Sequence, residues 1–409
     1  MKQTARIIST YSADVMGVSS ALFELGGMVV MHDPSGCNST YTTHDEPRWY
    51  DMDSMVYISG LSEIEAIMGD DEKLISDIVD AAEVLKPAFI AIAGTPIPTM
   101  TGFDFEAVAS VIEHKTGIPS FGFPTTGMNT YIHGASMALA GIAERFVDEP
   151  QADSARTGSD KIRVNILGLT PLDFSTNGQD TSIAGWLESE GFEVVSKWAM
   201  GSSLDEIRRS ADADVNLVVS AAGMGAARVL YERFGMPYAI GVPVGNELPG
   251  LLADQIKINV EKFRNGGEGG SFGSREISVN SGVFLDGSAG ADGSTYEKGF
   301  VAVIGEGVTS LSLASSIELE CGIPAKVLCA TECPEDILRE CDRMTPDEDD
   351  IIPELDGAAF VIADPLYKPI VPESAEFISL PSEAFSGRIY RDEIPDQTAD
   401  FSTFLKLST

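Results

Sequence analysis

Short apolar runs alternate with longer amphipathic stretches along most of the chain. In the first 150 residues, the apolar runs predict strands and the stretches between them predict helices that begin after polar caps such as Asp104. The expected strands are Met28–Met31, Ser54–Ile58, Phe89–Ala93 and Ser120–Phe123, and the expected helices are Glu72–Val84 and Phe105–Thr116. Strands that alternate with helices in this way form a parallel sheet.

Two further units repeat the alternation. A polar, non-periodic segment at 148–160 reads as the first linker, and the glycine-rich segment Asn265–Ser274 lacks the Gly-Lys-Ser/Thr ending of a phosphate loop and is interpreted as a flexible connection. Expected strands are Arg163–Leu167, Glu193–Lys197, Leu217–Ser220, Tyr238–Gly241, Gly299–Ile304 and Ala325–Ala330, and expected helices are Ser182–Glu190, Leu204–Ser210, Ala226–Phe234 and Leu311–Leu319. We therefore expect an α/β protein with domains at 1–150, 151–264 and 299–409, joined by a connection at 265–298. The N-terminal part could pack on the third domain, which ends in a C-terminal tail.

Length and composition limit the number of domains and the cellular compartment that we expect. The chain has 409 residues, enough for two to three domains of about 100–150 residues. No run approaches the ~20 apolar residues of a membrane span, and the N-terminus lacks a secretory apolar region. An odd number of cysteines, five, favours a reducing cytoplasm with free thiols.

The formal net charge of −36 excludes a nucleic-acid partner, because little positive charge is present to neutralise phosphates. It leaves two interpretations open, a surface adapted for solubility or an electric field that steers a basic partner such as an electron donor.

The richest candidate chemistry follows the first expected strand. There Pro34-Ser35-Gly36-Cys37 forms a turn that would lift one cysteine out of the sheet edge, with Gly36 leaving room for a bulky ligand. Polar and aromatic residues crowd the next positions, namely His44, Asp45, Glu46, Arg48 and Trp49. The alternative is that Cys37 is a small buried hydrophobic residue.

This turn resembles the Pro-x-Gly-Cys cluster-ligand turn of nitrogenase component 1 and its relatives, which include the protochlorophyllide reductase subunits and the nickel-sirohydrochlorin reductive cyclase. The segment Glu65–Leu74 is similar to the Phe-Gly-Gly-x-x-x-Leu segment of that family, and Pro87–Pro98 resembles its second cysteine strand and loop. The resemblance implies three Rossmann-like domains with parallel sheets flanked by helices around a central cleft.

Departures from the family pattern are equally informative. Thr95 stands where the second cluster cysteine would be, and no cysteine precedes Cys37. Ser220 replaces the cysteine that holds the active-site cofactor of true nitrogenase. The resemblance therefore implies a nitrogenase-like protein with no molybdenum–iron cofactor bound in the usual way.

With one suitable thiolate, Cys37, the resemblance implies an iron–sulfur cluster of the 4Fe-4S type shared between subunits, with Gly36 and Thr95 beside it. The other subunit would be a second copy in a homodimer or a related chain in a heterotetramer. Oxygen or nitrogen donors among His32, Asp33 and Asp45 could complete the ligand shell. The chain lacks a Walker A sequence, so ATP hydrolysis would belong to a separate nitrogenase reductase-like ATPase.

The small-molecule substrate would lie beyond the carboxyl ends of the strands. Candidate cleft residues are Thr126, Asn129, Ser220, Tyr367 and Lys368. The candidate catalytic residues are His32 and His44, of which one would act as a proton donor or ligand, and His133, which would contact the substrate. Each also has a purely structural interpretation as a cap, packing or surface residue. Glu306 and the segments Gly168–Phe174 and Asp364–Tyr367 are expected at the same cleft.

Two further expectations concern cysteines and contacts. Cys321, Cys329, Cys333 and Cys341 do not follow a ferredoxin spacing, so we expect buried or incidental thiols, with a redox pair of Cys329 and Cys333 as the minor alternative. A two-fold interface is expected from the aromatic and cationic residues Tyr41, Arg48, Trp49 and Tyr50.

Two functions remain open at this point. The first is an electron-accepting enzyme subunit. The second is a non-catalytic scaffold or receptor for a cofactor precursor, a tetrapyrrole or a metal.

Overall fold

The computed structural model of the chain describes residues 7, 10–34, 36, 38–150, 161–265, 271–273, 299–334 and 336–399. Cys37, most of the first expected linker and most of the glycine-rich connection lie outside these residues. Three parallel sheets flanked by helices make up the fold, which confirms the expected fold class.

The first sheet has the strand order β2-β1-β3-β4. Its strands are β1 (Met28–His32), β2 (Met55–Ile58), β3 (Ile90–Gly94) and β4 (Ser120–Phe123). The associated helices are α1 (Asp14–Leu22), α2 (Glu63–Met68), α3 (Asp71–Leu85), α4 (Pro96–Thr101), α5 (Phe105–Thr116) and α6 (Tyr131–Phe146), with a π-helical turn η1 (Tyr41–Asp45). Alternate residues of β1 face opposite ways: Val30 packs in the cluster under α3 and α5, and Val29 packs in the core that contains α1 and α6.

The second sheet has the order β6-β5-β7-β8-β9. Its strands are β5 (Arg163–Leu167), β6 (Glu193–Lys197), β7 (Val215–Val218), β8 (Tyr238–Ile240) and β9 (Ser271–Gly273). Its helices are α7 (Pro171–Phe174), α8 (Gln179–Ser189), α9 (Leu204–Arg208), η2 (Arg209–Asp212), η3 (Ala221–Gly223), α10 (Met224–Phe234) and α11 (Leu248–Arg264). Strand β9, which pairs in parallel with β8, lies in the segment that the sequence presented as a connection.

The third sheet has the order β12-β11-β10-β13-β14. Its strands are β10 (Phe300–Gly305), β11 (Ala325–Cys329), β12 (Arg343–Met344), β13 (Ala358–Ala363) and β14 (Glu376–Ser379). Its helices are α13 (Gly307–Cys321), α14 (Glu348–Glu354), η4 (Pro365–Ile370), α15 (Glu383–Ser386) and η5 (Gly387–Glu393).

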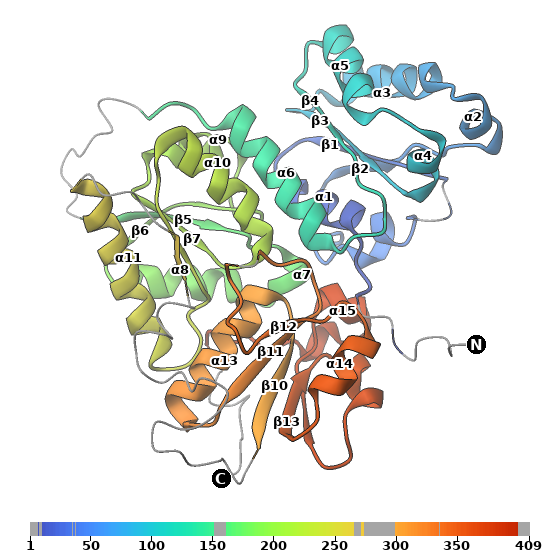
Figure 1. Ribbon diagram of the computed structural model, residues 1–409. Coiled ribbons are helices and arrows are strands. Elements are labelled where there is room, and N and C mark those ends of the chain that lie inside the picture. Colours follow the sequence, from blue (N-terminus) through green and yellow to red (C-terminus); the bar gives the residue numbers. More distant parts are fainter. Residues whose placement is uncertain are drawn as a thin grey trace.

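Helix α6 joins the first sheet to the rest of the molecule (Figure 1). It crosses α1 in close contact, because a Cβ at Gly134 would lie 1.8 Å from the carbonyl oxygen of Asp14 and one at Gly17 would lie 2.0 Å from that of Tyr131. The same helix packs on α10, where Gly225 donates its N–H to Ser136 Oγ at 3.0 Å.

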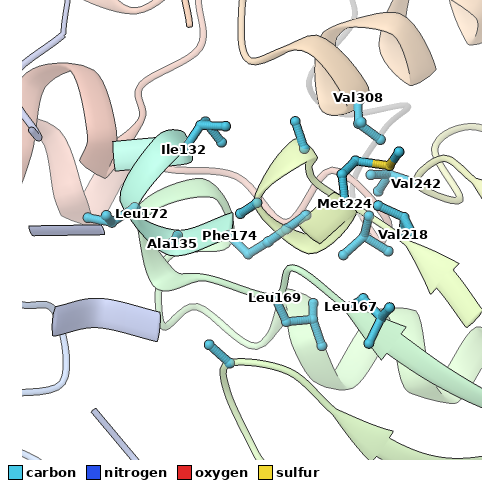
Figure 2. Close-up of a cluster of buried hydrophobic side chains, with 14 of the residues drawn as sticks. Ile132, Ala135, Leu167, Leu169, Leu172, Phe174, Val218, Met224, Val242 and Val308 are labelled. Atoms are coloured by element: carbon cyan, nitrogen blue, oxygen red, sulfur yellow. The ribbon is translucent and has the colours of Figure 1, made fainter. Parts of the chain in front are cut away.

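One apolar core runs through all three parts. Figure 2 shows Ile132 of α6 and Leu172 of α7 in the same cluster as Met224 of α10 and Val308 of α13. Because this core is continuous, the carboxyl ends of the second and third sheets are held close to the start of α6. Among the described residues, no helix is long and apolar enough to span a membrane.

Candidate functional site

Each sheet has a point at which the strand order reverses, and ligands of such open sheets bind outside the carboxyl ends of the strands there. In the first sheet, β1 and β3 flank this point, and Asp33 and Thr95 follow them. In the second and third sheets the flanking strands are β5 with β7 and β10 with β13.

The first-sheet site is built around the Asp33 carboxylate, which is 1% exposed. One of its oxygens accepts a hydrogen bond from Thr95 Oγ1 at 2.6 Å, and the other accepts one from Asn38 Nδ2 at 2.8 Å. Thr95 is itself buried and fixed by the start of α4. Both carboxylate oxygens are therefore committed within the chain, so Asp33 supports the turn and is poorly placed to bind a metal.

His32 lies beside this carboxylate but faces an apolar neighbour. Its Nδ1 lies 2.9 Å from Ser59 Oγ, and its ring centroid lies 4.4 Å from that of Phe103. Burial lowers the pKa of His32 to about 4, so the imidazole is neutral at physiological pH. A neutral, buried imidazole is a weak proton donor.

Within the turn, Gly36 is open to solvent. Gly36 is exposed, and a Cβ built on it would meet no atom within 4 Å, so the space above the turn is free of neighbouring described residues. Cys37, the expected cluster ligand, lies outside the described residues.

The other expected donors lie apart from Asp33. His44 Nδ1 is 3.1 Å from the hydroxyl of Tyr50. Asp45 accepts a hydrogen bond from Tyr11 at 2.6 Å and lies 3.6 Å from Arg388, so it ties the N-terminal segment to η5. Within the described residues, no three His, Cys, Asp or Glu side chains are placed to hold a metal ion. These described donors therefore do not form a metal-binding group among themselves.

The expectation that Tyr41 and Arg48 form an intersubunit core is wrong. Arg48 is 3% exposed and pairs inside the chain with Glu46 at 2.6 Å and Glu24 at 2.8 Å. The Tyr41 hydroxyl donates to Glu46 at 2.8 Å. Both side chains therefore contact residues of their own chain, because a buried charge must be paired within the fold. Trp49 is half-buried, and Tyr50 is 74% exposed.

A second site lies where the other two sheets converge. Glu306 follows β10, is 3% exposed and begins α13 by accepting hydrogen bonds from the N–H groups of Val308 and Thr309. It also accepts the N–H of Ala221, at 2.9 Å, which follows β7 of the second sheet. Burial raises the pKa of Glu306, and the N–H donors act in the opposite direction.

Asp173 faces Glu306 from the second sheet. It accepts hydrogen bonds from Thr170 Oγ1 at 2.9 Å and from the hydroxyl of Tyr131, the first residue of α6. Burial and the nearby charge of Glu306 raise the pKa of Asp173 to about 7. The three-residue group Tyr131, Asp173 and Glu306, which we call the junction group, thus takes one residue from each of the three parts of the fold.

A cavity of about 40 Å³ opens beside the junction group, enough for roughly one to four water molecules. Asp364, which follows β13, lines it and accepts hydrogen bonds from Ser386 Oγ at 2.7 Å and from the N–H of Ser382 at 2.9 Å. Burial raises the pKa of Asp364. The strand ends of the second and third sheets therefore meet around a small acidic cavity, as the topology predicts.

The expected cleft residues take mixed positions. Thr126 and Asn129 are held by the Asp14 carboxylate, which accepts the Thr126 N–H at 3.0 Å and the Asn129 amide at 3.2 Å. Ser220 is buried and caps η3 next to Glu306.

The remaining expected residues divide between core and surface. Tyr367 is fully buried near Asp364, whose charge together with burial raises the pKa of the Tyr367 hydroxyl. Lys368 and His133 are exposed, and the Lys368 ammonium lies 6.0 Å from the centre of the Phe377 ring. Tyr131 was not singled out from the sequence, and Asp173 was expected at the cleft only as part of the segment Gly168–Phe174. The signal was the Thr170-Pro171-Leu172-Asp173 cap that directly follows the first strand of the second unit.

Comparison with known proteins places this geometry in a family. Residues 14–357 match the family model described as nitrogenase component 1 type oxidoreductase. A nitrogenase iron-molybdenum cofactor biosynthesis protein NifE from Methanosarcina barkeri is 25% identical over 219 residues, covering 51% of this chain and 46% of that protein. One subunit of the light-independent protochlorophyllide reductase from Prosthecochloris aestuarii is 40% identical over 93 residues, covering 22% of this chain and 17% of that protein.

The chain thus matches less than half the length of these relatives. Among solved structures, one titled "Nitrogenase Cp1 at pH 6.5" superimposes with a TM-score of 0.65 at 16% identity, over 98% of this chain and 92% of that one. At this identity the likeness supports the fold alone. Because the family model covers most of the chain, the protein belongs to the nitrogenase component 1 type oxidoreductase family.

Proposed function

We propose that this protein is a subunit of a nitrogenase-like reductase. It accepts electrons from a separate ATP-dependent iron–sulfur protein and delivers them to a small molecule at the junction of the second and third sheets. The observation that carries the proposal is the junction group, in which Tyr131, Asp173 and Glu306 meet at the strand ends where open α/β sheets bind ligands.

The chemistry of reduction explains why such a group is useful. Each electron added to an unsaturated molecule builds negative charge, which a nearby acid neutralises by transferring a proton. An acid works best when its pKa lies near the operating pH, and the pKa of Asp173 is about 7. Asp173 holds the transferable proton, Glu306 raises its pKa, and Tyr131 orients the carboxylate.

For the electron path, we propose that Cys37 is this chain's ligand to a 4Fe-4S cluster shared with another subunit. When bound, such a cluster supplies one-electron transfer. The open turn at Gly36 and the internal commitment of Asp33 support a shared site over one completed by this chain alone. The second subunit is either another copy or a related chain.

The size of the cavity constrains the substrate. A cavity of about 40 Å³ is far below the ~300 Å³ of typical ligand pockets, so a molecule of tetrapyrrole size requires the second and third sheets to separate. A scaffold for a cofactor precursor is the second candidate, favoured by similarity over half of the chain to a protein named for cofactor biosynthesis.

Iron content tests the redox proposal. We expect anaerobically purified protein to be brown, and Cys37→Ser to lose most of its iron and visible absorbance while keeping its circular dichroism spectrum. The matched control is Cys341→Ser, a thiol at a distant edge of the third sheet, which should retain the iron. Equal iron content in wild type and Cys37→Ser would refute the assignment. A colourless wild-type protein that binds a precursor would favour the scaffold.

A further inference from the structure

Two thiols lie beside Gly307, the residue that follows Glu306 of the junction group. Cys329 is the last residue of β11 and is fully buried, and Cys333 lies just beyond it, half-buried. Both sulfurs approach Gly307, the first residue of α13: a Cβ there would stand 2.3 Å from Cys333 Sγ and 3.5 Å from Cys329 Sγ. Because Gly307 has no side chain, both sulfurs fit beside it, within bonding reach of one another after a small movement.

The surroundings of Cys333 favour a neutral thiol. The Cys329 sulfhydryl donates to the carbonyl oxygen of Thr331 at 3.3 Å, and the Glu306 carboxylate lies close by. The neighbouring Cys329 side chain, together with burial, raises the pKa of Cys333 well above its usual range. Metal binding would require buried thiolates next to a carboxylate, which is costly. A disulfide carries no charge and fits the same space.

We propose that Cys329 and Cys333 form a redox-active dithiol that closes to an intrachain disulfide. The oxidant is a low-molecular-weight disulfide such as oxidised glutathione. Cys333, the more exposed of the two, gives up its thiol proton to solvent as it attacks one sulfur of the oxidant, and one thiolate is released. The Cys329 thiolate then attacks the Cys333 sulfur and releases the second. The protein loses two electrons and two protons, and the oxidant becomes two thiols.

The loop between the cysteines connects this chemistry to α6. Glu332 accepts the N–H of Thr130 at 2.9 Å and also the Thr130 hydroxyl. Thr130 directly precedes Tyr131 of the junction group. Closing the disulfide shifts the backbone on either side of Glu332, so the clamp on Thr130 responds to the oxidation state. This inference goes beyond the proposed function and stands independently of it.

The test uses the full-length reduced protein, equilibrated in buffers of oxidised and reduced glutathione, quenched with an alkylating agent and mapped by peptide mass spectrometry. We expect the peptide that contains Cys329 and Cys333 to become two hydrogen atoms lighter and to resist alkylation. Its oxidised fraction should exceed that of Cys321 or Cys341 by more than about tenfold at a given buffer ratio. Hydrogen exchange at the Thr130 and Tyr131 amides should also change on oxidation.

Variants then assign the bond. Cys333→Ser and Cys329→Ser should each abolish the light peptide, whereas Cys321→Ser and Cys341→Ser should keep it. The wild-type measurement decides the matter even if Cys329→Ser fails to fold. Full alkylation of both thiols in the folded protein at every buffer ratio would overturn the proposal. So would a disulfide that persists in Cys333→Ser.

Discussion

The two candidate regions occupy equivalent places in their sheets and differ in the groups that surround their buried carboxylates. At the first-sheet site, Asp33 has a neutral hydrogen-bond donor for each oxygen, and Gly36 of the neighbouring turn is open to solvent. At the junction, Asp173 and Glu306 share one buried space, so the pKa of Asp173 rises to about 7. The same topological position therefore builds either a rigid support for a ligand turn or a group that can release a proton.

The regions also differ in how many parts of the fold contribute residues to them. Asp33, Asn38 and Thr95 all belong to the first sheet, so its site forms when that sheet forms. The junction group draws on α6, the second sheet and the third sheet. Its proton chemistry is a property of the assembled chain, and we expect the two regions to respond differently to mutation.

The largest expected loss of stability comes from removing the buried ion pair of Arg48, which lies in the same part of the fold as the first-sheet site. Arg48→Ala leaves Glu46, which is 1% exposed, as a buried charge without its main partner, and should destabilise the protein by about 3–5 kcal/mol. Thermal unfolding followed by circular dichroism measures this. Lys73→Ala is the control, because that lysine is half-exposed and its ion pairs should contribute at most about 1 kcal/mol. An unfolding midpoint equal to that of wild type would show that the ion pair between Arg48 and Glu46 does not hold the fold together.

A smaller, pH-dependent effect is expected at the junction. The pKa of Asp173 is raised from 3.8 to about 7 in the folded chain, so folding is favoured by its proton at low pH. As pH rises towards 7 the unfolded chain has already lost that proton, and stability falls by up to about 1.4 kcal/mol per pH unit. Asp173→Asn removes this contribution, so the variant should lose less stability than wild type between pH 5.5 and 8.

Unfolding midpoints at the two pH values measure the difference. The control is Asp205→Asn, whose carboxylate is almost fully exposed and should leave the wild-type slope unchanged. An Asp173→Asn slope equal to that of wild type would show that Asp173 does not titrate in this range.

Much of the fold could be predicted because its signals are local. The expected helix Phe105–Thr116 is α5, since Asp104 accepts the N–H of Ala107 and Gly117 ends the helix with a positive φ of 70°. Helix α6 was not predicted. Its buried positions follow a helical period, but several of them are small residues, and Gly134 resembles a helix breaker although it permits the close crossing with α1.

The two sites differ in how far they could be predicted from the sequence, because only one of them is a local motif. The turn at Cys37 is a contiguous motif and could be recognised directly. Tyr131, Asp173 and Glu306 are far apart in the chain, and each has an ordinary local explanation: the first residue of a helix, a capping partner and a helix cap. The pKa values of these three side chains are raised because they are buried together. That burial exists only once the three parts of the fold have packed against one another.

The smallest expected effect tests whether the two regions are independent. Thr95→Val keeps the shape of the side chain and removes the hydroxyl that donates to Asp33 at 2.6 Å. One oxygen of a buried carboxylate loses its donor while Asn38 still serves the other, so stability should fall by about 1 kcal/mol. Because sites without shared partners behave additively, the pH dependence contributed by Asp173 should stay at its wild-type value.

Unfolding midpoints of Thr95→Val, Asp173→Asn and the double variant at pH 5.5 and 8 measure both quantities. Thr101→Val, which removes a hydroxyl bonded only to a helix carbonyl oxygen among the described residues, serves as the control. A change in pH slope in Thr95→Val would mean that the turn and the junction are energetically coupled, and that the first-sheet site is more than a local support.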